Sequence, residues 1–344
     1  MSEAIDFIGD IHGHCDELRT LLSRLGYAES GGAFRYPGDG RRVVFLGDYV
    51  DRGPKIRETL RLVRAMCEAG SAVALMGNHE FNMLSYWHRN GIGGRLLRKS
   101  GGDYLRDHSS KNERAHAKTI EEFRGHPDEL RDMLDFVKTM PLYLETETFR
   151  AQHAGFDPEA VSALKSAGIR CLADGDYDEL IARANDEFDE YADSLFRPVE
   201  LLLKGAEIDL PSGLKFRDKD GNERTRTRVR WWVDPAKADF GSISLQKLDR
   251  SVGASPLPNE SRNRFFYRED ERPVFFGHYW LKGEPALLRS NVCCLDYSIA
   301  SPENDGGRLA CYRFDGEARL DESKFVWVGT DDLLCQENDI MSIC

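Results

Sequence analysis

Residues 43–53 read VVFLGDYVDRG, in which four apolar residues lead directly into a glycine, two aspartates and an arginine. The apolar run is typical of a buried strand that ends at Leu46. Charged groups are costly to bury unless they are paired or bind a metal. Asp48, Asp51 and Arg52 therefore require partners at the end of this strand, and similar segments elsewhere in the chain offer them.

Residues 5–8 and 72–76 are two further short apolar runs that read as strands. Between the three runs, leucines at 18, 21, 22 and 25 and apolar residues at 56, 60, 63 and 67 follow the spacing of amphipathic helices. The order strand, helix, strand, helix, strand predicts parallel strands joined by right-handed crossovers. Residues 28–41, rich in glycine, are expected to form a loop. The predicted class is α/β.

Each of the three strands ends in glycine and metal-competent side chains, in the segments Gly9-Asp10-Ile11-His12-Gly13, Gly47-Asp48 and Gly77-Asn78-His79-Glu80. The carboxyl ends of parallel strands meet at one edge of a sheet, where α/β proteins bind ligands. The polar side chains should therefore converge there. Oxygen ligands mixed with imidazole suit Mn²⁺, Fe or Zn²⁺ better than Ca²⁺.

The remaining sequence predicts one elaborated domain over residues 1–344, because no linker or internal repeat interrupts it. Residues 86–140 read as a mostly helical inserted cap, with histidines 88, 108, 116 and 126 on its surface. Residues 157–270 form a second insertion that contains an acidic helical stretch (177–191) and a polar turn (218–222). Strands are expected at 142–152 and 274–276, and short antiparallel strands at 292–328.

Composition limits the classes of partner. The chain carries 47 basic and 59 acidic residues, a formal net charge of −12. This disfavours non-specific nucleic-acid binding, which depends on basic residues against phosphates. An anionic substrate would be repelled unless bound cations reverse the local sign of charge.

The sequence offers no sign of secretion or membrane insertion. The first residues lack a charged and apolar leader, and no apolar run approaches the roughly 18 residues of a membrane span. The eight cysteines show no C-x-x-C spacing and are typical of reduced thiols, with Cys293 and Cys294 expected in the core. A cytoplasmic location is therefore expected.

Taken together, these motifs resemble the calcineurin-like metallophosphoesterase superfamily, and most closely its PPP branch. That branch contains serine/threonine phosphoprotein phosphatases and bacterial symmetrical diadenosine tetraphosphatases. The resemblance covers residues 5–85 closely and continues at Gln152-His153-Ala154-Gly155, at Gly277-His278 and in the tail. It implies a β-sandwich flanked by helices. Residues 86–140 and 157–270 match no pattern of the family.

The resemblance also implies a site with two divalent metal ions, Mn²⁺ being favoured over Fe or Zn²⁺. Its ligands would be Asp10 and His12 for the first metal, Asp48 between both metals, and Asn78, His153 and His278 for the second. Many members of the superfamily carry a further histidine in a G-H-x-H motif. Here Trp280 takes that place, which is similar to the PPP branch and weighs against the phosphodiesterase and nuclease branches.

His79 resembles the family's general acid, oriented by Asp51, and Arg52 resembles a phosphate-binding arginine. The resemblance implies a second phosphate-binding arginine, for which Arg228, Arg230 and Arg250 are candidates. For each of these three, a solvated strand or turn position is the competing interpretation.

The expected function is hydrolysis of phosphate monoesters, on phosphoproteins or small molecules, by attack of a metal-bridging hydroxide. One alternative is a symmetrical bis(5'-nucleosyl)-tetraphosphatase, since residues 293–297 and 306–313 resemble the closing strands of those enzymes. Glu80 is instead more like the protein phosphatases. A non-catalytic metal-bound scaffold or sensor is the other alternative, although the set His79, Asp51 and Arg52 argues against it.

Overall fold

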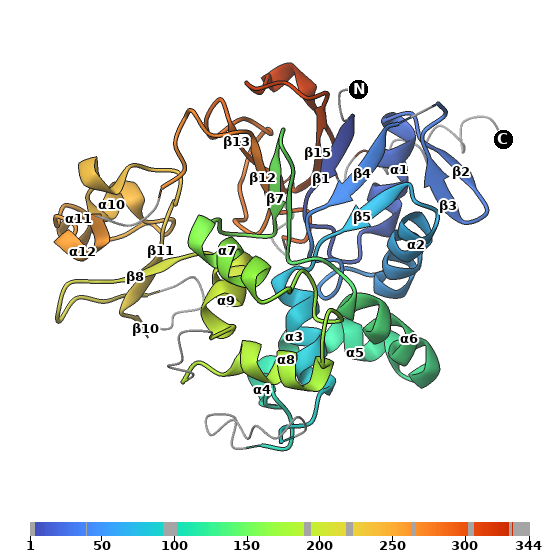
Figure 1. Cartoon of the computed structure of the whole chain (residues 1–344), viewed down its shortest axis with the longest axis horizontal. Coiled ribbons are helices and arrows are strands. Elements are labelled where there is room, and N and C mark those ends of the chain that lie inside the picture. Colours follow the sequence, from blue (N-terminus) through green and yellow to red (C-terminus); the bar gives the residue numbers. More distant parts are fainter. Residues whose placement is uncertain are drawn as a thin grey trace.

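The computed structural model describes residues 4–38, 40–91, 102–188, 194–217, 223–262, 266–301, 306–329 and Asp332 (Figure 1). The polar turn expected at 218–222 lies outside these residues. The helices are α1 (Cys15–Arg24), α2 (Ile56–Glu68), α3 (Asn78–Trp87), α4 (Ser110–Ala115), α5 (Ala117–Phe123), α6 (Pro127–Lys138), α7 (Pro158–Ser166), α8 (Tyr177–Asn185), α9 (Phe196–Lys204), α10 (Phe240–Ile243), α11 (Arg250–Gly253) and α12 (Asn259–Arg262), with 3₁₀ turns η2 (Pro235–Lys237) and η3 (Glu322–Lys324). In the described part of the chain, no helix is both long enough and apolar enough to span a bilayer.

The strands form two main sheets and three small hairpin-like pairs. They are β1 (Ile5–Ile8), β2 (Ala28–Ser30), β3 (Ala33–Arg35), β4 (Arg42–Phe45), β5 (Ala72–Ala74), β6 (Tyr143–Glu145), β7 (Arg150–Gln152), β8 (Glu207–Asp209), β9 (Phe216–Arg217), β10 (Glu223–Arg224), β11 (Arg226–Arg228), β12 (Val274–Phe276), β13 (Val292–Cys294), β14 (Asp296–Tyr297), β15 (Arg308–Phe314) and β16 (Phe325–Gly329). One sheet has the order β14-β15-β1-β4-β5 with β16 beside β15, and the other has the order β13-β12-β7-β6.

The pairing confirms most of the predicted strand order. Strand β1 is parallel to β4, and β4 is parallel to β5, as the alternation of strands and helices predicts. Two expectations are wrong. The segment 28–41 contains the hairpin β2–β3, and β13 pairs in parallel with β12 before the antiparallel strands of the tail begin. Such short strands carry too few residues for an alternating pattern to show their direction.

The two sheets pack face to face around a row of aromatic rings. Phe7 of β1 stacks on Phe275 of β12 with ring centroids 3.8 Å apart, and Phe149 meets the edge of Phe7 at 5.0 Å. Adjacent residues of a strand point to opposite faces of its sheet. Accordingly Val44 joins this inter-sheet core, while Phe45 joins the core under the helices. This confirms the α/β class with a sandwich flanked by helices.

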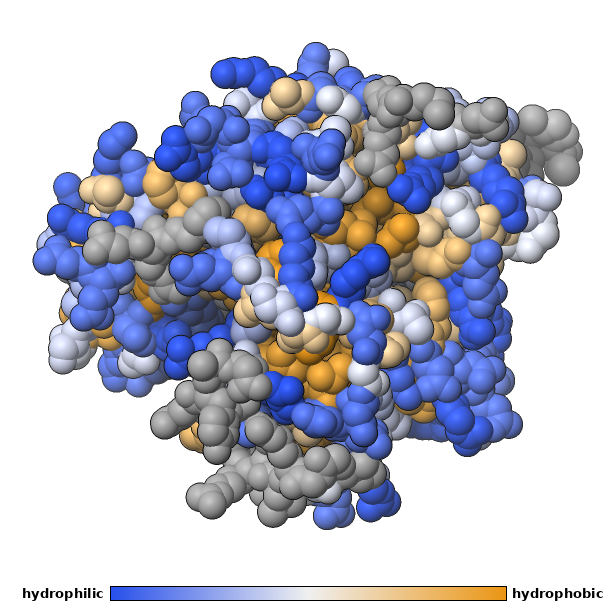
Figure 2. All heavy atoms as spheres, viewed as in Figure 1, coloured by the Kyte–Doolittle hydropathy of each residue, from blue (hydrophilic) through white to orange (hydrophobic). Residues whose placement is uncertain are grey.

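Helices α1 and α2 cover the outer face of the first sheet. The predicted cap is mostly helical in its described part, with α5 packed on α2 (Figure 1). Strands β8–β11 and helices α10–α12 form a lobe with its own small apolar core around Phe240. Figure 2 shows a mainly hydrophilic face, with apolar residues visible near its centre. The division into one domain with two insertions stays a prediction.

The stack of Phe7 and Phe275 predicts a large stability effect. Phe275→Ala should lower the free energy of unfolding by about 3–5 kcal/mol, because it leaves a cavity between the sheets. Phe188, which is 63% exposed, is the matched control, and Phe188→Ala should change stability by less than about 0.5 kcal/mol. Urea unfolding followed by circular dichroism measures both. Equal effects would contradict the two-sheet core.

Candidate metal centre

Asp48 lies in the turn that follows β4, and a second carboxylate holds this turn in place. Glu80 of α3 accepts hydrogen bonds from the backbone N–H groups of Asp48 (2.8 Å), Tyr49 (2.7 Å), Val50 (3.2 Å) and Gly77 (3.0 Å). A β-carbon at position 77 would collide with Asp48, so only glycine allows the two turns to approach this closely. Glu80 therefore fixes the position of the Asp48 backbone.

Backbone strain concentrates at this place. Seven non-glycine residues of the described chain have φ between 46° and 73°: His12, Asp48, Asp51, Arg52, His278, Trp280 and Ser298. This left-handed conformation costs an L-residue about 1–2 kcal/mol. The first six are predicted site residues or their direct neighbours, and such strain typically marks functional sites because the surrounding structure must compensate for it.

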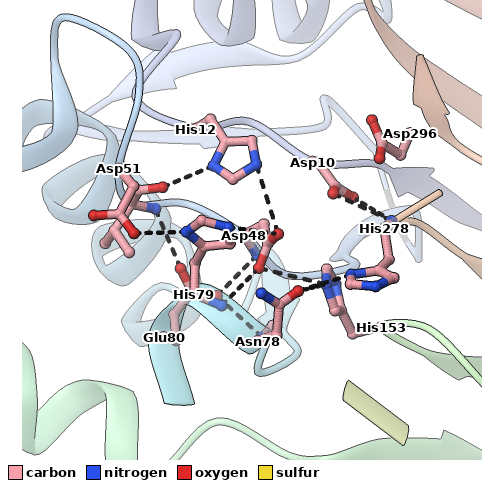
Figure 3. A network of polar contacts seen from close by, with 12 residues as sticks. Asp10, His12, Asp48, Asp51, Asn78, His79, Glu80, His153, His278 and Asp296 are labelled. Carbon is pink, nitrogen blue, oxygen red and sulfur yellow. Dashed lines mark hydrogen bonds and ion pairs between the residues drawn. The ribbon is translucent and has the colours of Figure 1, made fainter. Parts of the chain in front are cut away.

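Histidines surround the Asp48 carboxylate on both sides (Figure 3). Its Oδ2 atom lies 3.6 Å from His12 Nε2 and 3.9 Å from His79 Nε2, while Oδ1 lies 3.4 Å from His153 Nε2. Two groups of candidate ligands therefore share Asp48: one with His12 and His79, the other with His153 and His278, each with ligand atoms within 4.8 Å of one another.

The donor atoms fit divalent metal ions. His12 donates its Nδ1–H to the Val50 carbonyl at 2.8 Å, so its buried Nε2 carries a lone pair that has no hydrogen-bond partner within the described chain. His278 Nε2 is likewise buried and unpartnered there. Buried polar atoms of native proteins are rarely left without a partner. Imidazole nitrogens beside a carboxylate are the ligands that Mn²⁺, Fe and Zn²⁺ accept.

The other two predicted ligands lie beside these groups. Asn78 Oδ1 is 3.0 Å from His153 Nε2 and 2.7 Å from His278 Nδ1, which places it in the second group. Asp10 accepts the backbone N–H of His278 at 3.2 Å and packs against Gly277, where a β-carbon would collide with its carboxylate. The structure thus brings all six predicted ligands to one edge of the sheets.

Sequence reasoning missed a further buried acid, Asp296 (Figure 3). Its carboxylate accepts the N–H groups of Trp280 at 2.7 Å and Ser298 at 3.0 Å, and it lies near Asp10. Residues 293–297 resemble the closing strands of symmetrical tetraphosphatases, but no polar motif there marks Asp296 as part of the site.

The charges of the site oppose one another. Burial lowers the pKa of His12 to about 3, so this imidazole is neutral, as a metal ligand must be. Burial and repulsion from Asp296 raise the pKa of Asp10 well above its ordinary value. Burial would also raise the pKa of Asp48, but His153, His79 and His12 together outweigh burial and hold the pKa well below its usual range. A divalent cation would offset the repulsion among these carboxylates.

His79 and Asp51 form the predicted pair. His79 donates its Nδ1–H to Asp51 Oδ2 at 2.6 Å, and its Nε2 atom faces the side of Asp48. Burial lowers the pKa of His79, but Asp48 and the Asp51 hydrogen bond outweigh burial and raise it above its ordinary value. Burial likewise opposes ionisation of Asp51, yet hydrogen bonds from His116 and His79 hold its pKa well below the usual range.

His116 corrects the expectation of surface histidines in the cap. It is only 1% exposed and donates to Asp51, and His88 is also buried, at 8% exposed. His108 and His126 are exposed as expected. The correction has a physical reason: His116 lies in a predominantly polar segment that reads as solvated, and its partner Asp51 is 65 positions away in the sequence.

Arg52 stands at the mouth of the site. Its guanidinium lies over the Trp280 ring, 4.3 Å from the centroid, an attractive cation–π arrangement. Both residues line an open cavity of about 720 Å³ that also reaches Asp48, Asn78 and His79. Trp280, which replaces the histidine of the G-H-x-H motif, therefore supports the arginine.

The structure places the three other candidate arginines in different environments. Arg228 of β11 lines the cavity, together with Arg224 and Arg226. Arg230 is half-buried, and its backbone N–H bonds to the Ile243 carbonyl, outside the residues that line the cavity. Arg250 begins α11 on the outer lobe, where it is exposed. This placement favours Arg228 as the candidate for the second phosphate-binding arginine.

Comparisons with known proteins agree with this architecture. Residues 4–279 match the calcineurin-like phosphoesterase family. The chain is 46% identical over 74 residues to the asymmetrical bis(5'-nucleosyl)-tetraphosphatase PrpE of Halalkalibacterium halodurans, covering 22% of this chain and 30% of that protein. It is 32% identical over 152 residues to the symmetrical bis(5'-nucleosyl)-tetraphosphatase of Ralstonia nicotianae, covering 44% and 42%. The chain thus spans less than half the length of either relative.

Among solved structures, a protein serine/threonine phosphatase from Saccharomyces cerevisiae aligns over 95% of this chain and 79% of its own. The sequence identity is 13% and the TM-score is 0.46.

The four hydrogen bonds to Glu80 predict that this carboxylate is needed for metal binding. Glu80→Gln should lower stability by about 1–3 kcal/mol, because an amide NH₂ would face backbone N–H donors. It should also weaken Mn²⁺ binding measured by calorimetry, because the Asp48 turn would shift. The matched control is Glu122→Gln, since Glu122 also accepts two backbone N–H bonds, from Ile56 and Arg57, but far from Asp48 in the sequence. Unchanged Mn²⁺ affinity in Glu80→Gln would refute this role.

Proposed function

This chain belongs to the calcineurin-like phosphoesterase family, and we propose that it is a phosphatase that uses two divalent metal ions to hydrolyse phosphate esters. The observation that carries the proposal is Asp48, a buried carboxylate shared by two groups of imidazoles beside the pair His79–Asp51. Mn²⁺ is the proposed metal, with Fe and Zn²⁺ as alternatives.

The six predicted ligands would hold the metals: Asp10, His12, Asp48, Asn78, His153 and His278. When bound, such ions neutralise phosphate charge and bring the pKa of a water ligand toward neutrality. This would also overcome the repulsion between an acidic chain and an anionic substrate.

The chain's own side chains bind the phosphate and supply a proton. Arg52 is always charged and planar, and from its place over Trp280 it can donate two parallel hydrogen bonds to phosphate oxygens. Arg228 lines the same cavity and is proposed as the second phosphate-binding arginine. His79 would protonate the departing oxygen from Nε2, because Asp51 holds its other ring nitrogen.

Two classes of substrate suit this site. The first is a phosphate monoester, on a phosphoprotein or a small molecule. The second is a dinucleoside polyphosphate, which is favoured by the names of both curated relatives and by the cavity's further arginines, Arg224 and Arg226. Glu207 and Glu223 line the same cavity, and Glu207 lies 3.9 Å from Arg226, so this arginine is partly neutralised.

Product analysis separates the two classes. The purified protein with Mn²⁺ is incubated in parallel with diadenosine tetraphosphate and with a phosphothreonine peptide at equal concentrations. Rapid release of nucleotides with a slow peptide reaction supports the polyphosphate substrate, and two ADP or ATP plus AMP distinguish symmetrical from asymmetrical cleavage. Phosphate release from the peptide alone supports the monoester. Bound metal without turnover of either substrate would support the scaffold alternative.

Asp48→Asn should remove both metals together, since this carboxylate is the ligand that the two groups share. Metal analysis after dialysis should find a loss of both ions, and activity should be abolished. Asp16→Asn is the matched control, because the Asp16 side chain is 47% exposed and forms an ion pair only with Lys55, at 2.8 Å, among the described residues. If Asp48→Asn protein kept both ions, the shared role of this carboxylate would be contradicted.

His79→Ala should affect substrates unequally. Hydrolysis of alkyl phosphates should slow about 10²–10⁴-fold, because a poor leaving group needs the proton, while activated aryl phosphates should change far less. Steady-state rates with a phosphothreonine peptide and 4-nitrophenyl phosphate measure the ratio, with His126→Ala as an exposed histidine control. An equal fall for both substrates would exclude His79 as the acid.

A further inference from the structure

The inserted segment 86–140 contacts the acid pair His79–Asp51 through two buried side chains at the start of α5. Thr119 is 0% exposed and His116, which precedes the helix, is 1% exposed. Both contact Asp51, and neither belongs to a motif of the family resemblance.

Thr119 closes a small ring of hydrogen bonds with Asp51. Its hydroxyl donates to Asp51 Oδ1 at 2.5 Å and accepts the backbone N–H of Asp51 at 3.0 Å. The same residue thus holds the main chain and the side chain of Asp51. A φ of 66° at Asp51 is costly by itself, so these bonds also help to offset backbone strain.

His116 supplies the third side-chain partner of Asp51. Its Nδ1–H lies 3.0 Å from Asp51 Oδ2 and 3.2 Å from Oδ1, while His79 occupies Oδ2 at 2.6 Å. Of the three side chains that bond to this carboxylate in the described structure, two therefore come from the insertion. Together they fix the carboxylate plane, and with it the direction of the His79 ring.

Helix α5 is itself anchored to the sandwich. Glu122 accepts the N–H groups of Ile56 at 2.8 Å and Arg57 at 2.9 Å, at the first turn of α2. Figure 1 shows α5 between α2, α3 and α6. The helix therefore presents His116 and Thr119 from a fixed base.

We propose that His116 and Thr119 are positioning residues for the acid pair His79–Asp51, so that the inserted segment completes the catalytic apparatus as well as covering it. This inference rests on the proposed function of His79. It gives residues 86–140 a defined contribution to proton transfer.

Two pairs of variants test the inference. Thr119→Val and His116→Leu remove the bonds to Asp51, whereas Thr119→Ser and His116→Asn keep a donor at nearly the same place. Glu121→Gln is the control, because Glu121 is exposed on the same helix, where it pairs with Lys118 and does not touch Asp51. All five are measured as Mn²⁺-loaded protein.

Thr119→Val and His116→Leu should each slow hydrolysis of a phosphothreonine peptide about tenfold or more, the size expected for losing a bond to a charged group. The rate with 4-nitrophenyl phosphate, Mn²⁺ content and KM should stay close to wild type. Thr119→Ser and His116→Asn should recover most of the rate, and Glu121→Gln should leave the ratio of the two substrates unchanged. An equal loss with both substrates, or no loss, overturns the inference.

A second readout needs no turnover. In protein with ¹⁵N-labelled histidine, the His79 ring should show one tautomer, with a slowly exchanging Nδ1 proton. Exchange of this proton should accelerate in Thr119→Val and His116→Leu but not in Glu121→Gln. If the wild-type protein hydrolyses neither substrate, the proposed function fails while this measurement still decides the positioning role. An unchanged His79 ring in both variants refutes it.

Discussion

The structure depends above all on placing one charged carboxylate, Asp48, where water scarcely reaches it. An isolated buried charge is strongly unfavourable, so the surrounding chain must supply partners from several directions. Glu80 holds its backbone from α3. His79 of the same helix approaches its oxygens, as do His12 and His153 from two other segments. The need for partners around Asp48 thus shapes the turns that follow the strands of both sheets.

The same requirement explains the unusual backbone around the site. Six of the seven left-handed residues lie in the turns that carry predicted metal ligands, Asp51 or Arg52, where an ordinary turn would direct these side chains elsewhere. The aromatic core between the sheets compensates for this strain, because it fixes the strands from which the turns emerge. Stability gained in the sandwich is thereby used to hold unfavourable conformations at its edge.

Much of the fold was accessible from the sequence because its signals are local. Apolar runs followed by glycine and polar residues mark strand ends, and parallel strands bring such ends together, so the gathering of Asp10, His12, Asp48, Asn78 and His79 could be predicted. Their roles stay predictions. His116, Thr119 and Asp296 could not be found, since each acquires its meaning from partners distant in sequence. The exposed place of Arg250 depends on the lobe's own packing, which no periodic pattern revealed.

The contact between α5 and Asp51 also bears on how such a protein can change over evolutionary time. Inserted segments are commonly regarded as modules that can be exchanged while the core keeps its chemistry. Here the segment and the core share hydrogen bonds across 68 positions of sequence. A chimera that takes its insertion from a relative would need to bring equivalents of both side chains, so this insertion and the turn after β4 form a single unit of inheritance.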